Sequence, residues 1–175
     1  TSAAGTASVT ATAGTVAGSY AVTATASGVA TPASFALTND PGPAAAVATL
    51  AGSTPQTAES GGFPFQVALG VRATDAFGNP VPGVTVTWSA PASGARAILS
   101  ATTKVTAADG TASVTATTGN TSGSYAVTAS VPGGHTATFD LTNAVGVPAA
   151  LLRVSGDAQS ATVGAAFAAS LVVRV

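Results

Sequence analysis

The sequence repeats itself with a period of about one hundred residues. Three segments recur in the same order, two of them letter for letter. The pairs are 5–12 (GTASVTAT) with 110–117, 18–24 (GSYAVTA) with 123–129, and 35–39 (FALTN) with 139–143 (FDLTN). A solenoid repeat spans about 20–50 residues, so this period is too long for one, and it matches an independently folding domain. We therefore expect tandem domains.

The repeated segments divide the chain into three units. Residues 43–146 form one complete unit, residues 1–42 match its last strands, and residues 147–175 match its first strands. Because the sequence opens on Thr and shows no signal peptide, we expect an internal fragment of a longer protein. The linkers at 39–43 and 143–148 contain proline, which limits bending between neighbouring units.

Within a unit, apolar residues alternate with a period of two, which indicates strands rather than helices. Val and Thr dominate these runs, and β-branched residues favour extended chain. Gly, Pro, Asn and Asp separate the runs. The clearest runs begin at Phe63, Val84, Val114, Tyr125 and Phe139. The pattern predicts an all-β fold of tandem immunoglobulin-like antiparallel β-sandwiches, with about seven strands in each complete unit.

The largest side chains indicate where the core of the sandwich lies. Trp88, the one tryptophan, falls on the third run, where an immunoglobulin fold places its central tryptophan. Tyr125 stands two residues before Val127, which is the spacing of a tyrosine corner. The predicted core residues are Trp88, Tyr125, Val127, Val67, Leu69 and Tyr20.

Composition excludes several classes of protein. Charged residues make up 6% of the chain and the formal net charge is −1, whereas a nucleic-acid binder needs a basic surface. No stretch approaches about 20 apolar residues, so we expect no membrane insertion by this segment. The chain has no cysteine, which removes disulfides and cysteine–zinc sites. Few charges and no oxidisable sulfur suit an exported bacterial protein, and we expect an extracellular or cell-surface location.

No residue pattern for catalysis emerges. His135 is the one histidine, and neither a G-x-S-x-G elbow nor a phosphate loop occurs. We predict no enzyme, no catalytic residue and no cofactor. A calcium site at Asp40, Asp75 and Asp109 is the one metal hypothesis, because calcium prefers several oxygen ligands and these turns are predicted at one end of the sandwich. The alternative is that Asp75 and Asp109 bond their own turn backbones. It is favoured because the first unit has Ala4 at the position of Asp109.

Four segments resemble, in order, the bacterial immunoglobulin-like domain of the group 1 type. They are 75–88 (DAFGNPVPGVTVTW), 94–100 (GARAILS), 109–115 (DGTASVT) and 123–129 (GSYAVTA). Such domains build the stalks of invasin- and intimin-like adhesins. The resemblance covers the middle unit and both partial ones, and it implies a sandwich fold, export and a structural or adhesive role. A rival resemblance to the transthyretin-like domain of surface proteins shares GNPVPGVTV but explains less of the later segments.

We therefore predict a non-catalytic stalk of a large bacterial surface or secreted adhesin-like protein, which projects a distal binding module. Its partners would be the neighbouring repeats of the same chain, and a host-surface or extracellular ligand would bind through other domains. The alternative is an adhesive or carbohydrate-binding accessory module of a secreted protein or enzyme. That function needs exposed aromatic rings, for which Phe77 and Phe63 are the candidates, although we expect Phe77 to plug its turn.

Overall fold

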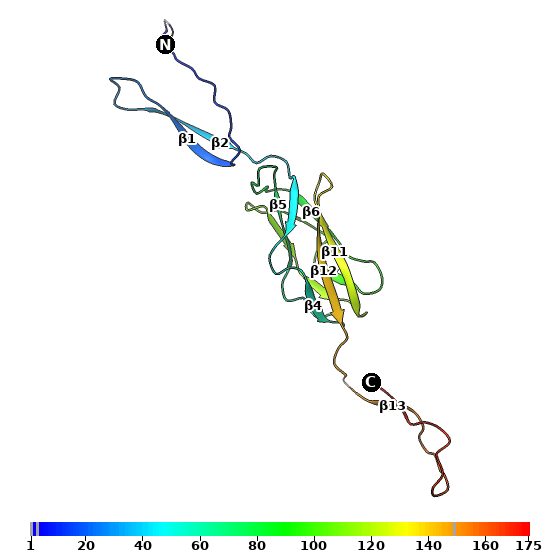
Figure 1. The fold of residues 1–175 in the computed structure, drawn as a ribbon. Coiled ribbons are helices and arrows are strands. Elements are labelled where there is room, and N and C mark those ends of the chain that lie inside the picture. Colours follow the sequence, from blue (N-terminus) through cyan, green and yellow to red (C-terminus); the bar gives the residue numbers. More distant parts are fainter. Residues whose placement is uncertain (1, 3, 149) are drawn as a thin grey trace. The chain divides into compact units, whose positions relative to one another are not determined.

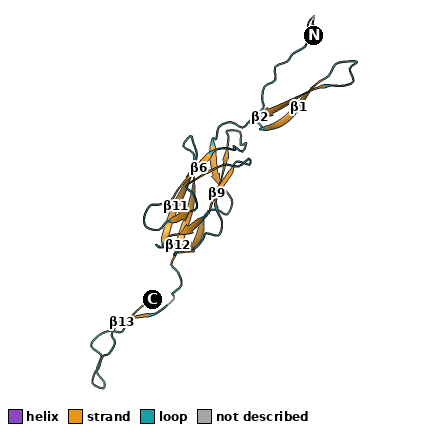
Figure 2. Ribbon diagram, turned by 180° about the vertical axis from the view of Figure 1, so that it is seen from behind, coloured by secondary structure: helices purple, strands orange, loops and turns teal. Residues whose placement is uncertain are grey.

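The computed structural model describes residue 2, residues 4–148 and residues 150–175. The chain divides into two compact units, Thr1–Ala144 and Val145–Val175. Strands, turns and loops account for all the described residues, as Figure 2 shows. Accordingly, this part of the chain offers no helix with the length and apolar character needed to cross a bilayer.

A two-layer β-sandwich forms the centre of the first unit (Figure 1). Its strands are β3 (Ala46–Thr49), β4 (Gln56–Glu59), β5 (Leu69–Thr74), β6 (Thr85–Ser89), β7 (Ala97–Leu99), β8 (Thr103–Val105), β9 (Thr111–Val114), β10 (Ala116–Thr118), β11 (Gly123–Ser130) and β12 (Thr136–Ala144). One layer is the sheet β3-β5-β9, and the other is the sheet β4-β12-β11-β6-β8. Pairing within both layers is antiparallel except that β4 runs parallel to β12.

The sandwich has more strands than the seven expected, because the chain between β6 and β11 is divided into short pieces. β9 pairs with β5, whereas β10, which follows immediately, pairs with β7 in a separate two-stranded sheet. Thr115 lies at the change of sheet, where its N–H donates to Oγ of Ser100 and its carbonyl accepts from the Ser100 N–H. The alternating pattern of residues 112–116 does not reveal this change of partner.

The core lies between the two layers and is built from alternate residues of the longer strands. Val86 and Trp88 of β6, and Val127 and Ala129 of β11, are fully or almost fully buried. The side chains that complete it on the facing strands and on β12 are Leu69, Val71, Ala112, Val114, Phe139 and Leu141. Burial of apolar surface contributes about 25 cal/mol per Å², so this cluster is the main stabilising feature of the sandwich and fixes the loops at both its ends.

Two further hairpins form separate sheets. The first pairs β1 (Gly18–Ala24) with β2 (Ala33–Asn39), and the second pairs β13 (Leu152–Ser155) with β14 (Val172–Arg174). The register of β1–β2 is that of β11–β12, whose sequence it copies, and β13–β14 pairs in the register of β3–β5 before a shift between Arg153 and Ser155. The matching pairs are Val22–Phe35 with Val127–Phe139, and Leu152–Arg174 with Ala48–Arg72.

Candidate functional site

Residues 75–79, which we call the 75–79 turn, follow β5 and are organised by the carboxylate of Asp75. Its Oδ1 accepts the backbone N–H groups of Phe77 and Asn79, each at 2.9 Å. The Asp75 N–H in turn donates to the Asn79 carbonyl at 2.9 Å. Gly78 has a φ of +84°, a conformation that glycine adopts without steric cost. Asp75 is only 5% exposed, so the turn is an ordered part of the fold.

Asn79 connects this turn to the chain before the sandwich. Its Nδ2 donates to the Thr15 carbonyl at 2.8 Å and to Oδ2 of Asp75 at 2.9 Å, and its Oδ1 accepts the Ala17 N–H at 3.0 Å. The same Oδ2 of Asp75 accepts the Gly42 N–H at 3.0 Å. Sequence reasoning did not single out Asn79. The available signal was an Asn after Gly in a turn that opens with Asp, since these residues hydrogen-bond turn backbones.

Hydrogen bonds to the Asp75 carboxylate lower its pKa from 3.8 to about 2. The side-chain hydrogen bond from Asn79 is the largest cause, burial acts in the opposite direction, and the N–H groups of Gly42, Asn79 and Phe77 lower the pKa further. Each donor stabilises the ionised form. Asp75 is therefore a permanent acceptor at neutral pH.

Two of the three aspartates in the calcium hypothesis, Asp75 and Asp109, accept hydrogen bonds from their own turns. Oδ1 of Asp109 accepts the hydroxyl of Thr111 at 2.7 Å and its N–H at 3.0 Å, and these two bonds lower the Asp109 pKa. Asp40 is exposed. Within the described residues, no three His, Cys, Asp or Glu side chains gather closely enough to hold a metal ion. Asp75 and Asp109 thus make the turn contacts that were the alternative to metal binding.

A family model described as "Bacterial Ig-like domain (group 1)" matches residues 64–144. This segment is a group 1 bacterial Ig-like domain. The match begins before β5 and ends with β12, and it includes the 75–79 turn. A comparison with curated proteins gave no match.

One solved structure shares the fold of this chain at low sequence identity, and a second is reported as similar to it. FdeC, described as a novel, broadly conserved Escherichia coli adhesin that elicits protection against urinary tract infections, is 20% identical with a TM-score of 0.54, and the match covers 78% of this chain and 45% of that one. The D0–D1 domain of intimin is 21% identical over 71% of this chain and 63% of that one, with a TM-score of 0.40. At 20% identity, the likeness to FdeC shows the fold only.

Within the Ig-like domain, Trp88, Leu69 and Val127 are buried between the two layers. Tyr125 is partly buried against the same core, and burial raises its pKa to about 12. Its hydroxyl donates to Oδ1 of Asn143 on the neighbouring strand at 2.8 Å. The tyrosine near the start of β11 therefore bonds a side chain of β12, rather than the upstream backbone of a tyrosine corner.

Two residues predicted for the core lie on the surface instead. Val67 is 40% exposed because the ladder of β5 begins only at Leu69. The backbone of Val67 bonds the side chain of Gln56, with the Val67 N–H donating to Oε1 and Nε2 donating to the Val67 carbonyl. Tyr20 is also 40% exposed, because the hairpin β1–β2 has no second layer over it in the described part of the chain.

The two candidate aromatic residues for ligand binding are both exposed. Phe77 is 69% exposed and Phe63 is 51% exposed. The expectation that Phe77 plugs its turn is therefore wrong. The turn is closed by the Asp75 carboxylate and the carbonyl of Asn79, so the ring of Phe77 is not needed inside it.

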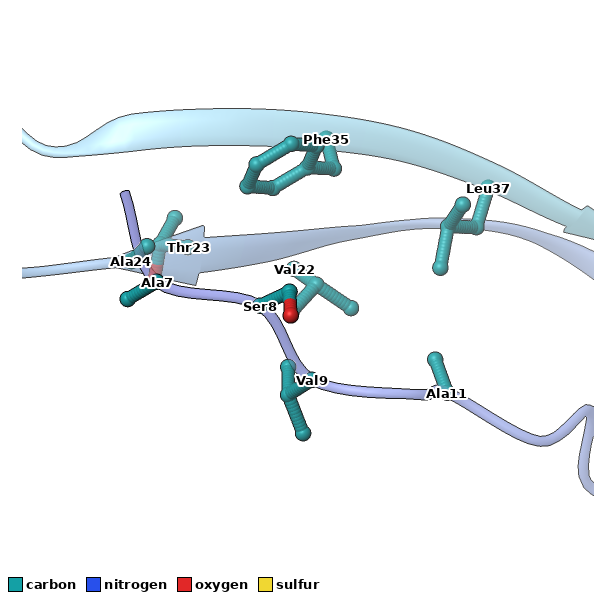
Figure 3. Close-up of a pocket in the computed structure, with 9 residues that line it drawn as sticks. All are labelled: Ala7, Ser8, Val9, Ala11, Val22, Thr23, Ala24, Phe35 and Leu37. Atoms are coloured by element: carbon teal, nitrogen blue, oxygen red, sulfur yellow. The ribbon is translucent and has the colours of Figure 1, made fainter. Parts of the chain in front are cut away.

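A hollow of about 520 Å³ lies beside the hairpin β1–β2, and Figure 3 shows Phe35, Val22 and Val9 among its lining residues. The lining is mostly apolar, and its members repeat core residues of the Ig-like domain. The repeats of Val9, Val22, Phe35 and Leu37 are Val114, Val127, Phe139 and Leu141, all at most 3% exposed. The hollow thus has the chemistry of a sandwich interior that lacks a facing layer among the described residues.

Proposed function

We propose that this chain consists of tandem Ig-like repeats that serve as a non-catalytic spacer in a bacterial surface or secreted adhesin-like protein. Residues 1–42 would be the end of one repeat, residues 43–146 a complete repeat, and residues 147–175 the start of another. The partners of each repeat would be its neighbours in the chain, and ligand binding would belong to a distal domain. The observation that carries the proposal is that residues at corresponding positions of the three units pair with one another in the same strand register.

Side-chain hydrogen bonds at copied positions support the repeat arrangement. Nδ2 of Asn39 donates to the Val16 carbonyl at 3.1 Å, and Nδ2 of Asn143 donates to the Thr121 carbonyl at 3.0 Å. The hydroxyl pairs Ser19–Thr38 and Ser124–Thr142 also correspond. These corresponding contacts support the proposal that the copies share a structure as well as a sequence.

A glutamine makes the same set of bonds at the start of the second and third units. Nε2 of Gln56 donates to the carbonyls of Ser53 and Val67, each at 2.9 Å. Nε2 of Gln159 donates to the carbonyls of Gly156 and Ala169, each at 2.8 Å. In both cases Oε1 accepts the N–H of the residue on the far side of the loop. These bonds support a third repeat that begins after residue 146.

The spacer function follows from the length that one domain adds. β12 has nine residues, and at about 3.3 Å per residue it extends over about 30 Å. The chain enters the complete domain near β3 and leaves it after β12, so each added domain moves the following chain onward by a length of this order. Such a unit needs no ligand site of its own, and its acidic turn residues Asp75 and Asp109 already serve as backbone acceptors.

The experiment is to lengthen the chain by one unit. A variant in which residues 43–146 are duplicated should increase the maximum dimension in small-angle X-ray scattering by about 30–40 Å, the length of one domain. A control with a Gly/Ser insertion of equal length should add a disordered segment with a root-mean-square length of about 50–60 Å, and its scattering should show a flexible chain instead of a further folded unit. An unchanged maximum dimension in the duplicated variant would contradict a spacer.

A binding module remains the second candidate because of one observation, the exposure of the Phe77 ring. Flat exposed aromatic rings are suited to stack on the apolar face of a sugar. Binding of the chain to a panel of glycans, lost in a Phe77→Ala variant and kept in a Phe63→Ala variant, would favour this function. Absence of binding in the unmodified chain would favour the spacer.

A further inference from the structure

Asn79 bonds the sandwich to Thr15 and Ala17, which lie just before β1. We propose that the 75–79 turn is a docking element that binds the loop of residues 15–17 in the preceding repeat through the Asn79 carboxamide. We also propose that residues 120–122 are the matching site for a second copy of this turn. The second half rests on the proposed tandem arrangement, whereas the first rests on hydrogen bonds within this chain.

The carboxamide of Asn79 binds two backbone groups that are two residues apart. Its Nδ2 donates to the Thr15 carbonyl and its Oδ1 accepts the Ala17 N–H, at 2.8 and 3.0 Å. The carboxamide thus bonds the loop as the N–H and the carbonyl of one residue in a parallel strand would. Because both partners are backbone atoms, the contact does not depend on the side chains of the loop, and any repeat with this loop geometry can be bound.

Asp75 fixes the orientation of the amide before any neighbour is present. Its Oδ2 accepts Nδ2 of Asn79 at 2.9 Å, which directs the carboxamide oxygen away from the carboxylate. Its Oδ1 accepts the Asn79 N–H, so backbone and side chain of the docking residue are held together. The Gly42 N–H completes the arrangement by binding Oδ2. One carboxylate thereby connects the docking residue to the linker that joins the two repeats.

The loop on the other side is shaped by an asparagine of its own repeat. Asn39 binds the Val16 carbonyl, which lies between the two groups that Asn79 binds. The groups on either side of Val16, the Thr15 carbonyl and the Ala17 N–H, instead bind the sandwich through Asn79. Asn39 of the same repeat thus binds the loop on one side, and Asn79 of the sandwich binds it on the other.

The far end of the complete domain repeats this loop. There Asn143 binds the Thr121 carbonyl at 3.0 Å, so the groups that correspond to Thr15 and Ala17 are the Asn120 carbonyl and the Ser122 N–H. Neither group has a hydrogen-bond partner among the described residues, and both residues are exposed. The 120–122 loop therefore offers the same donor and acceptor to a following Asp-x-x-x-Asn turn.

The test is a distance measurement in the full chain, which contains no cysteine and can be labelled at two introduced ones. Spin labels at Ser27 and Ser93, both exposed, report the distance between the hairpin β1–β2 and the sandwich by pulsed electron paramagnetic resonance. We expect a single narrow distance peak in the parent. In Asn79→Ala we expect a broad distance distribution in place of that narrow peak.

Asn79→Ala also removes a contact within its own turn, so a second variant tests the docking contact alone. Ala17→Pro deletes the N–H that Asn79 accepts and leaves the 75–79 turn untouched. Its distance peak should broaden as in Asn79→Ala. Asn120→Ala, an exposed asparagine with no recorded side-chain bond, is the matched control and should keep the narrow peak. A broad parent distribution, or a narrow one in either variant, would overturn the docking function of Asn79.

The 120–122 loop is tested in the variant with duplicated residues 43–146. Ser122→Pro in the first copy should broaden distances across the second junction and leave the first junction narrow. Unchanged distances there would overturn the second half of the proposal. In the duplicated chain without Ser122→Pro, a broad distance distribution across the second junction, together with scattering that still lengthens by one domain, would refute the docking site without refuting the spacer, so the two proposals fail separately.

Discussion

The hydroxyl of Tyr125 donates to Oδ1 of Asn143 at 2.8 Å, and this bond joins β11 to β12 on the side of the sheet that faces the core. Asn143 is 1% exposed, and its Nδ2 donates to the carbonyls of Arg96 and Thr121, each at 3.0 Å. A single carboxamide therefore connects two loops and a strand at the end of the sandwich where the chain leaves it.

Replacement of the two partners should have unequal effects on stability. Tyr125→Phe removes one hydrogen bond and should lower the free energy of unfolding by about 1 kcal/mol, whereas Asn143→Ala leaves several buried groups without partners and should cost about 2–3 kcal/mol. Ser124→Ala, which removes an exposed hydroxyl pair, is the control and should stay within about 0.5 kcal/mol. Chemical denaturation followed by Trp88 fluorescence measures all three, and equal losses for Tyr125→Phe and Asn143→Ala would show that Nδ2 of Asn143 contributes nothing.

Phe35 and Phe139 occupy copied positions in different surroundings, which makes them a matched pair. Phe139 is fully buried, so Phe139→Ala should lower the free energy of unfolding by about 3–5 kcal/mol. Phe35 is 55% exposed, and Phe35→Ala should change the unfolding of the Trp88 core by less than about 0.5 kcal/mol. A large effect of Phe35→Ala would mean that another surface covers the hairpin β1–β2 in solution.

Gly110 is required for a close approach as well as for its backbone conformation. Its φ is +76°, and a Cβ at this position would lie 2.6 Å from the Ala73 carbonyl oxygen. Gly83 has a similar φ of +74° but open space around it. Gly83→Ala should therefore cost only about 1–2 kcal/mol for the left-handed conformation, and Gly110→Ala should cost clearly more. Thermal unfolding of both variants separates the cost of the left-handed conformation from the cost of the steric clash with the Ala73 carbonyl. Equal melting temperatures would contradict the close approach.

Acid should weaken the fold through Asp75. Its native pKa of about 2 lies below the ordinary value of 3.8, so the unfolded state binds more protons between these values. The stability that the carboxylate provides is complete above the ordinary pKa and is lost as the pH falls toward 2. Asp75→Asn should be less stable at neutral pH and should lose less of its remaining stability between about pH 5 and pH 2. Parallel curves of unfolding free energy against pH for parent and variant would contradict this prediction.

The sequence predicted the long strands of the sandwich because their apolar residues alternate without interruption. Val86, Trp88, Val127 and Phe139 all point between the layers, as a period of two requires. It did not predict the surface position of Val67, because the bond pattern of Gln56 takes that backbone out of the ladder and leaves no trace in local hydropathy.

The contacts of the candidate site were harder to predict than the strands. Asn79 binds residues that lie 62 and 64 positions earlier in the sequence, and it binds only their backbone atoms. Backbone partners require no particular side chain at positions 15 and 17 and exclude only proline at 17, so no sequence pattern marks them. Asp75 was recognisable as a turn residue because aspartate binds nearby N–H groups, and that local part of the prediction agrees with its bonds to Phe77 and Asn79.

The position of β12 between β11 and β4 has a mechanical consequence. Tension along the chain would be applied where β12 continues into the following residues, and β12 is hydrogen-bonded along both its edges, antiparallel to β11 and parallel to β4. Withdrawal of this strand must shear both ladders together instead of opening them one bond at a time. The last strand of the domain is thereby arranged to resist a force applied along the chain.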